Sequence, residues 1–246
     1  MFKVLKYILN NIVISISFFK IRKGKRWWAF RNVPIARQLL KESNDILFSK
    51  FMGSGAGKGF SLWPDFNVYC LLIVFENNES VKQQVLLNPA HQLYANQSDA
   101  QYNVLMQCIS AHGLWNNLQP FVSTKDNRLL PNQQVGVITR ASIRKSLIWK
   151  FWQFVPAVSR QIGKNTEVLF SKGIGEVPLV EQATFSIWPN QEAIKKFAYR
   201  GENHAAAVKK TRELNWYSEE LFVRFAIEET FGSNIEYFGS NLKADY

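Results

Sequence analysis

The feature of this sequence that most limits its fold is an internal repeat with a spacing of 122 residues. The segment Leu47-Phe48-Ser49-Lys50 recurs as Leu169-Phe170-Ser171-Lys172, and Val33-Pro34 recurs as Val155-Pro156 at the same spacing. No gap is needed between the two matches. Because solenoid units run only to about 50 residues, a repeat of this length indicates a duplicated domain.

Both halves predict the same order of elements. In the first half we expect strands at residues 12–19, 46–52, 68–75 and 114–122, and helices at 28–41 and 79–87. In the second half we expect strands at 135–143, 168–174, 180–188 and 217–225, and helices at 147–162 and 191–200. This order predicts an α+β fold whose simplest topology is the ferredoxin-like βαββαβ unit. Two such units then pack as a pseudo-dimeric α/β barrel.

The repeat also predicts the domain limits. The first ferredoxin-like repeat covers residues 12–122, and the second covers 135–228. Between them, 123–134 has the polar, turn-rich composition of a linker. We interpret 229–246 as a C-terminal tail that adds little to the core.

A strong positive charge favours anionic partners. The chain has 30 Lys and Arg against 19 Asp and Glu, a formal net charge of +11. The densest basic run, 20–26, precedes Trp27 and Trp28, a composition suited to a lipid headgroup boundary. A solvated loop is an equally acceptable interpretation of this run. No nucleic-acid-binding module is recognisable, so we expect no nucleic-acid partner.

Cysteine content and the leading residues bear on the compartment. Cys70 and Cys108 each lie in an apolar run, which predicts two small buried side chains rather than a disulfide. Residues 1–20 do not read as a signal peptide, because Asn10 and Asn11 interrupt the apolar stretch. No segment approaches the roughly eighteen apolar residues that span a bilayer. We expect a cytoplasmic protein, with a peripheral contact to the inner membrane as a further expectation.

Of the three histidines, His204 has the most suggestive surroundings. Three alanines follow it, so in a helix the surface beside the imidazole is low enough for a flat macrocycle. His204, Val208 and Arg212 share one helical stripe, which puts an imidazole and a guanidinium on the same side. A proximal histidine is a common ligand of haem iron. The alternative is an ordinary histidine on an exposed helix.

The other two histidines are interpreted as structural. An alignment of the halves with an offset of 113 places His91 on His204, and His112 reads as a turn or edge residue. None of the three has the spacing of a zinc or non-haem iron site.

The glycine run 53–59 fails the phosphate-loop and dinucleotide-binding patterns. We interpret it as a strand connector. No Ser-His-Asp or Cys-His arrangement is suggested by position, so hydrolase chemistry is unsupported.

Four segments resemble the spheroidene monooxygenase family. They are Lys150 to Ser159, Gly173 to Pro178, Gln182 to Pro189 and Trp216 to Leu221. The glycine run is also similar, and the resemblance covers residues 12–228. It implies a monooxygenase that oxidises an acyclic, methoxylated carotenoid at C-2 to a 2-oxo product, using dioxygen and a ferredoxin-type electron donor. The apolar, basic leader before residue 12 departs from the family.

The resemblance further implies haem b as the cofactor and His204 as its iron ligand, with Arg212 on the same stripe. Arg140 and Arg144, four positions apart on one extended run, are candidates for polarising bound oxygen or pairing with a propionate. Ordinary strand-edge charges are the alternative. Two other functions stay open: a haem enzyme of this fold acting on another apolar or nitrogenous small molecule, and a non-enzymatic ligand-binding barrel.

Overall fold

The structure is a computed structural model. It describes residues 12–43, 45–57, 61, 63–76, 80–123, 129–153, 167–200, 216–239 and 242. None of the helices in these ranges is long and apolar enough to cross a membrane.

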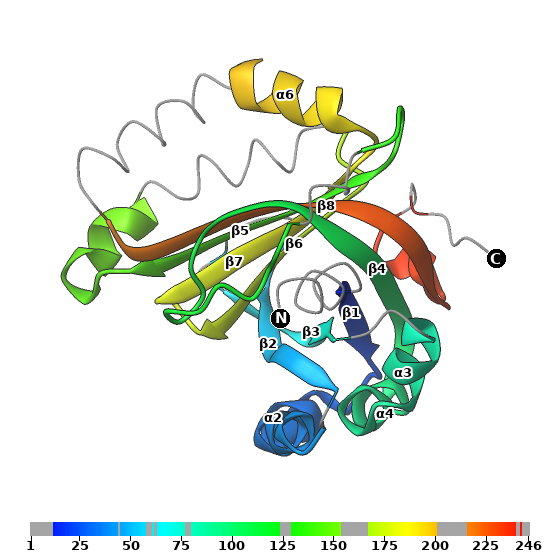
Figure 1. The fold of residues 1–246 in the computed structure, drawn as a ribbon. Helices are drawn as coiled ribbons and strands as arrows, with labels where there is room; N and C mark the ends of the chain where they lie inside the picture. Colours follow the sequence, from blue (N-terminus) through cyan, green and yellow to red (C-terminus); the bar gives the residue numbers. More distant parts are fainter. Residues whose placement is uncertain are drawn as a thin grey trace, which may run out of the picture.

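Eight antiparallel strands of the described chain close into a barrel (Figure 1). In sequence order they are β1 (Val13–Ile21), β2 (Ile46–Gly55), β3 (Pro64–Phe75), β4 (Ser98–Gly113), β5 (Val135–Ile143), β6 (Phe170–Val177), β7 (Glu181–Trp188) and β8 (Tyr217–Ser233). Around the barrel the order is β1-β3-β2-β6-β7-β5-β8-β4. The predicted α+β class is confirmed.

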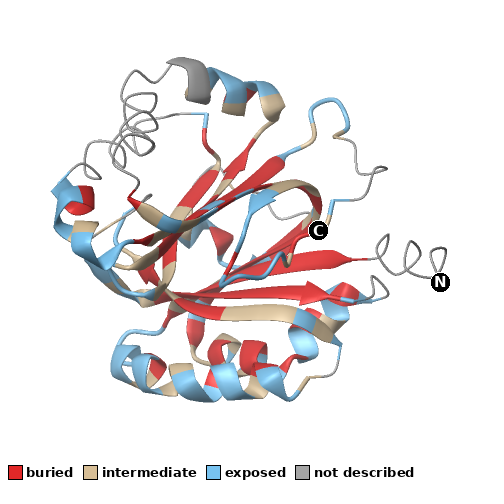
Figure 2. Ribbon diagram, turned by 60° about the vertical axis from the view of Figure 1, so that its left-hand side comes forward, coloured by how far each residue is buried: buried red, intermediate tan, exposed pale blue. Residues whose placement is uncertain are grey.

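The barrel interior is a packed apolar core. Side chains of a strand alternate between its two faces, so every second residue points inward. Phe18, Phe170 and Phe185 meet there, with ring centroids 4.8 to 6.1 Å apart. Cys70 and Cys108 are buried in the same core and form no disulfide with each other, as predicted. The strands are therefore largely buried, as Figure 2 shows.

Helices cover the outside of the first half of the barrel. They are α2 (Arg26–Lys41), α3 (Val81–Leu87) and α4 (Pro89–Ala95). Their apolar faces pack on outward-facing side chains of β1, β2 and β3 and form a second core. Asn88 caps α4, because its Oδ1 accepts hydrogen bonds from the backbone N–H groups of Ala90 and His91 at 3.0 and 3.2 Å. The sequence patterns did not predict α4.

The second half carries α6 (Gln191–Arg200), on the far side of the barrel from α2 (Figure 1). Two short 3₁₀ helices, η1 (Lys145–Leu147) and η2 (Ile235–Tyr237), lie after β5 and β8. Residues 148–153 are helical, which agrees with the start of the helix expected at 147–162. The rest of that helix lies outside the described residues.

The two halves meet at a short seam between β2 and β6. Only two residue pairs join these strands: Gly53 with Gly175, and Ser54 with Ile174. Gly53 and Gly175 are equivalent positions of the sequence repeat, so each half contributes the same residue to the pair. The strand order is β4-β1-β3-β2 in the first half and β8-β5-β7-β6 in the second, and β4 pairs with β8 to close the barrel.

Two expected boundaries were wrong. The fourth strand is Ser98–Gly113 and not 114–122. The latter segment begins with a tight turn, in which Asn116 and Asn117 have positive φ. The last strand continues to Ser233, eight residues beyond its predicted end, because it stays paired with β4 as far as Gln101.

Part of the glycine run also differs from the expectation. Gly53 and Gly55 lie inside β2 rather than in a connector. Residues 58–60 lie outside the described part.

Candidate active site

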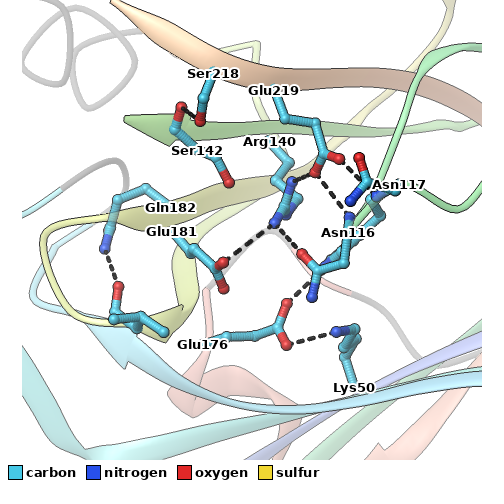
Figure 3. Close-up of polar contacts among 12 residues, drawn as sticks. Lys50, Asn116, Asn117, Arg140, Ser142, Glu176, Glu181, Gln182, Ser218 and Glu219 are labelled. Carbon is cyan, nitrogen blue, oxygen red and sulfur yellow. Dashed lines mark hydrogen bonds and ion pairs between the residues drawn. The ribbon is translucent and has the colours of Figure 1, made fainter. Parts of the chain in front are cut away.

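A network of charged and amide groups closes one end of the barrel around Arg140 of β5 (Figure 3). The Arg140 side chain is 1% exposed. Its Nη1 donates to Glu219 of β8, and its Nη2 donates to Asn116 Oδ1 at 2.6 Å. The Glu219 carboxylate also accepts from the backbone N–H groups of Asn116 and Asn117, each at 2.7 Å. One carboxylate thus ties together β5, β8 and the turn after β4.

The Glu219 carboxylate is ionised at neutral pH. Burial by itself would raise the pKa of Glu219, but hydrogen bonds from Asn117, Asn116 and Arg140 outweigh it and hold the pKa below the usual value. Arg140 and Glu219 therefore form an ion pair.

The network continues to the β2–β6 seam through Trp115. The guanidinium carbon of Arg140 lies 5.2 Å from the centroid of a Trp115 ring. Trp115 Nε1 donates to Glu176 Oε1 at 2.6 Å, and Lys50 Nζ donates to Glu176 Oε2 at the same distance. Because its two terminal nitrogens already donate hydrogen bonds, Arg140 acts in this structure as part of a rigid network. We call this network the barrel cap; its members are Lys50, Trp115, Asn116, Asn117, Arg140, Glu176 and Glu219.

A cavity of about 430 Å³ lies outside the barrel at the seam. Its walls come from α2, from the β2–β3 hairpin and from the β6–β7 hairpin. Apolar groups dominate the lining, among them Phe30, Phe66 and Leu179. Its size lies within the usual range of small-molecule sites.

The outer faces of the two half-sheets differ in side-chain size. Strand pairing aligns five outward positions of the first half with five of the second: Phe19 with Ala141, Phe51 with Gly173, Tyr69 with Gln182, Leu71 with Thr184 and Ile73 with Ser186. In the first half all five are large and fill the core beneath α2 and α4. In the second half small or polar residues replace them. At these five positions the outer surface of the second half-sheet is therefore lower than that of the first.

The predicted haem-side residues His204 and Arg212 lie outside the described residues. The structure places Arg140 and Arg144 at the end of the same strand, but in different surroundings. Arg140 is buried within the cap, whereas Arg144 is exposed and its backbone N–H donates to Trp216 O at 2.8 Å.

The two described histidines lie apart from each other. His91 of α4 is 1% exposed, its Nε2 is 2.9 Å from Asn103 Oδ1, and its ring packs on Phe19. Burial lowers the pKa of His91, and the Asn103 hydrogen bond offsets this only in part. These contacts agree with a structural role. His112 is exposed near the end of β4. Among the described residues, no group of His, Cys, Asp and Glu is arranged to hold a metal ion.

Several members of the barrel cap were missed by sequence reasoning, namely Lys50, Trp115, Glu176 and Glu219. A signal existed for some of them. Glu176 and Glu219 both lie in segments that carry the family resemblance, and opposite charges on β5 and β8 are expected to pair once the two strands are known to be neighbours.

The fold is similar to solved structures of aldoxime dehydratase. One has a TM-score of 0.57 at 6% identity and covers 88% of this chain and 81% of its own. A second, in complex with butyraldoxime, has a TM-score of 0.59 at 5% identity and covers 88% and 79%. At this identity the likeness establishes the shared fold alone.

Sequence relatives are far more similar. No protein-family model matches the chain. Spheroidene monooxygenase of Cereibacter sphaeroides is 34% identical over 221 residues, which cover 89% of this chain and 68% of that protein. The enzyme of the same name from Rhodobacter capsulatus is 31% identical, covering 90% of this chain and 92% of its own. With this similarity along nearly its whole length, the chain belongs to the spheroidene monooxygenase family and is a monooxygenase, an oxidoreductase.

Proposed function

We propose that this chain is a haem-dependent monooxygenase that oxidises an acyclic carotenoid at C-2 to a 2-oxo product. Dioxygen and reduced ferredoxin are the co-reactants. Each turnover places one oxygen atom on carbon and releases the other as water, with two electrons from the donor. A methylene group reaches the ketone after two turnovers and loss of one water from the geminal diol. The names and identities of the relatives support the substrate class.

The observation that carries the haem proposal is the low outer surface of the second half-sheet. Gly173, Ala141 and Thr184 are buried there, at positions where the first half has Phe51, Phe19 and Leu71. A flat macrocycle fits against small side chains and is excluded by large aromatic ones. The residues present therefore fit a haem on this face and leave no room for one on the equivalent face of the first half.

In this proposal His204 holds the haem iron, and Arg212, on the same predicted helical stripe, pairs with a propionate carboxylate. Haem b, when bound, supplies the activation of dioxygen. The protein excludes water and orients the carotenoid.

Arg140 of β5 and Arg144, which follows the last residue of β5, have different roles in this proposal. Arg144 is exposed just after the end of the strand, and in this proposal it polarises bound oxygen or pairs with a propionate carboxylate. Arg140 would have to leave Glu219 to polarise oxygen itself. We therefore propose that Arg140 acts mainly by fixing the end of β5, and with it the position of Arg144.

We also propose that the barrel is pseudo-dimeric, built from two copies of one βαββαβ unit. The equal strand order of the halves and the pairing of Gly53 with Gly175 support this. The units are 12–122 and 135–228, with 123–134 as linker and 229–246 as tail. The continuation of β8 to Ser233 extends the second unit into that tail.

A peripheral membrane contact forms a further part of the proposal. Trp27 is 68% exposed, and its ring stacks on Phe30 at 5.7 Å. Phe30 contacts Phe66 at 5.9 Å, and Trp63 nearby in the sequence is 77% exposed. With the basic run 20–26, these rings suit an anionic lipid surface.

Liposome flotation tests the contact. Wild type should float with anionic vesicles, and Trp27→Ser with Trp63→Ser should reduce the floating fraction. Trp149→Ser removes an equally exposed ring from the second half and should float like wild type. A wild type that stays in the dense fraction contradicts the contact.

The visible spectrum of protein from haem-supplemented cells tests the cofactor and its ligand. Wild type should show a Soret band that His204→Ala removes or shifts. His112→Ala replaces an exposed histidine and should leave the band unchanged. A colourless, folded wild type would instead indicate a ligand-binding barrel.

Activity with ferredoxin, dioxygen and an acyclic methoxylated carotenoid then tests the substrate. A haem-loaded protein that leaves this carotenoid unchanged would indicate a haem enzyme for another apolar or nitrogenous molecule.

A further inference from the structure

A buried tyrosine hydroxyl group lies in the wall of the cavity at the seam. Tyr69 lines the cavity and is 3% exposed, and among the described residues its Oη has no hydrogen-bond partner. Its neighbour Tyr94, with ring centroids 5.3 Å apart, donates to Ala29 O at 2.6 Å. Since an unpaired buried hydroxyl costs folding free energy, the unpartnered Tyr69 stands out.

Of the four charged side chains that line the cavity, Arg37, Asp65 and Glu176 have partners in the protein, and Arg31 is exposed. Asp65 Oδ2 accepts from Lys172 Nζ at 2.8 Å, and Arg37 donates twice to Phe51 O at 3.2 Å. The Tyr69 hydroxyl is thus a neutral donor in a mainly apolar cavity. Burial, and then the negative charge of Asp65, raise its pKa to about 12, so it keeps its proton at every physiological pH.

We propose that this cavity binds one end of an elongated apolar molecule that carries an ether, hydroxyl or carbonyl oxygen, and that the Tyr69 hydroxyl donates a hydrogen bond to that oxygen. The proposal rests on the proposed function, because the molecule is then the carotenoid substrate. A cavity of about 430 Å³ holds an end of such a polyene rather than its whole length.

The position of the cavity agrees with this role. Gly175 and Gln182 line the cavity, and Gln182 also belongs to the low outer surface of the second half-sheet, where we place the haem. The half-exposed rings of Phe30 and Phe66 lie at its other side, next to the proposed lipid contact. The cavity therefore extends from apolar rings on the lipid side to small and polar residues on the haem side.

The chain offers a substitution that fills the cavity without disturbing the strands. Gly53 lines the cavity, and a Cβ at this position would meet no atom within 4 Å. Gly53→Leu should therefore occupy the space and keep the fold. Its repeat partner Gly175 is unsuitable, because a Cβ there would lie 2.7 Å from Glu181 O.

The test titrates two detergent-solubilised acyclic polyenes, one with a terminal methoxy group and one pure hydrocarbon of equal length. Binding is followed by quenching of tryptophan fluorescence. Tyr69→Phe should weaken binding of the methoxylated polyene about five- to tenfold and leave the hydrocarbon unaffected, as loss of one hydrogen bond predicts. Tyr94→Phe, the matched control, should bind both like wild type. Gly53→Leu should weaken both.

Equal affinity of wild type and Tyr69→Phe for the methoxylated polyene would overturn the proposal, as would normal binding by Gly53→Leu. Binding that depends on Tyr69 in a protein that does not oxidise the polyene would sink the proposed function and keep this inference. If Tyr69→Phe and Gly53→Leu both oxidise the polyene with the KM of wild type, this inference fails and the proposed function stands.

Discussion

Lys50 and Lys172 occupy equivalent positions of the sequence repeat, and each forms an ion pair with a carboxylate of the other half. Lys50 Nζ lies 2.6 Å from Glu176 Oε2, and Lys172 Nζ lies 2.8 Å from Asp65 Oδ2. All four side chains are 13 to 17% exposed. Only two residue pairs join the strands at the seam, and the two half-buried ion pairs therefore add to the interactions that hold it.

Replacing Lys172 with Met should destabilise the protein by about 1–3 kcal/mol at pH 7, because Asp65 keeps its charge and loses its partner. Urea unfolding of the variant beside wild type measures this. Lys82→Met, which breaks an exposed ion pair with Glu229, should cost less than about 1 kcal/mol.

The effect of Lys172→Met should depend on pH in a defined direction. Burial would raise the pKa of Asp65, but Lys172 and Asn67 hold it below the usual 3.8. The ion pair therefore stabilises fully above pH 3.8, and its contribution is lost as the pH falls through the lower, folded-state pKa. A difference between wild type and variant that grows on acidification would contradict this assignment.

Removing the charge at the centre of the barrel cap should have a larger effect. Arg140→Met leaves the half-buried Glu219 carboxylate without its counter-ion and Asn116 Oδ1 without its donor, and we expect a loss of about 3–5 kcal/mol. Arg140→Lys should recover only part, since an ammonium group cannot reach Glu219 and Asn116 together as a guanidinium does. Thermal unfolding of both variants provides the comparison, and equal stability of Arg140→Met and wild type would show that the cap is dispensable.

Tyr69 of β3 and Tyr94 of α4, whose rings pack together, should respond in opposite ways to loss of their hydroxyl groups. Tyr94→Phe removes the hydrogen bond from the Tyr94 hydroxyl to Ala29 O and should cost about 0.5–1.5 kcal/mol. Tyr69→Phe removes an unpartnered hydroxyl and should leave the stability unchanged or raise it. Chemical denaturation without ligand measures both, and a destabilised Tyr69→Phe would reveal a partner for its hydroxyl.

The paired glycines of the seam should also differ. Gly175→Ala places a Cβ 2.7 Å from Glu181 O and should destabilise by about 1–3 kcal/mol. At Gly53 the added methyl group meets open space, so Gly53→Ala should be neutral or stabilise by up to about 1 kcal/mol. Gly175→Ala should therefore melt at a lower temperature than wild type, and Gly53→Ala at the same or a higher temperature. Equal decreases in the melting temperatures of the two variants would mean that the backbone at Gly53 also needs glycine.

The repeat made much of the fold predictable, because two copies of one strand-and-helix order leave few topologies. The wrong fourth strand has a physical reason. Segment 114–122 is apolar because Trp115 and Phe121 are buried against the interior core at one end of the barrel, which a strand pattern cannot distinguish from pairing. In the real strand Tyr102, Val104 and Met106 face inward, but Leu105 is also apolar and polar residues flank the segment, so the sequence shows no clear alternation.

The candidate site was predictable only in part. Arg140 was singled out as a residue, but its partner Glu219 lies 79 positions away, and only the pairing of β5 with β8 brings them together. Tyr69 carried no sequence signal at all, since an unpartnered hydroxyl is a property of its neighbours and not of its own segment. His204 and Arg212 stay predictions.

Because so few residue pairs join β2 to β6, the seam is the place where a local opening of the barrel wall would require the fewest strand pairs to break. Twelve residue pairs join β4 to β8 on the opposite side, so opening the barrel at the seam would break far fewer strand pairs, together with the two ion pairs that cross it. Such an opening would widen the cavity and admit a long, stiff polyene sideways, without threading it end-on. The thiol of Cys70, sealed inside the closed wall beside Met52, would become reactive only in that open form.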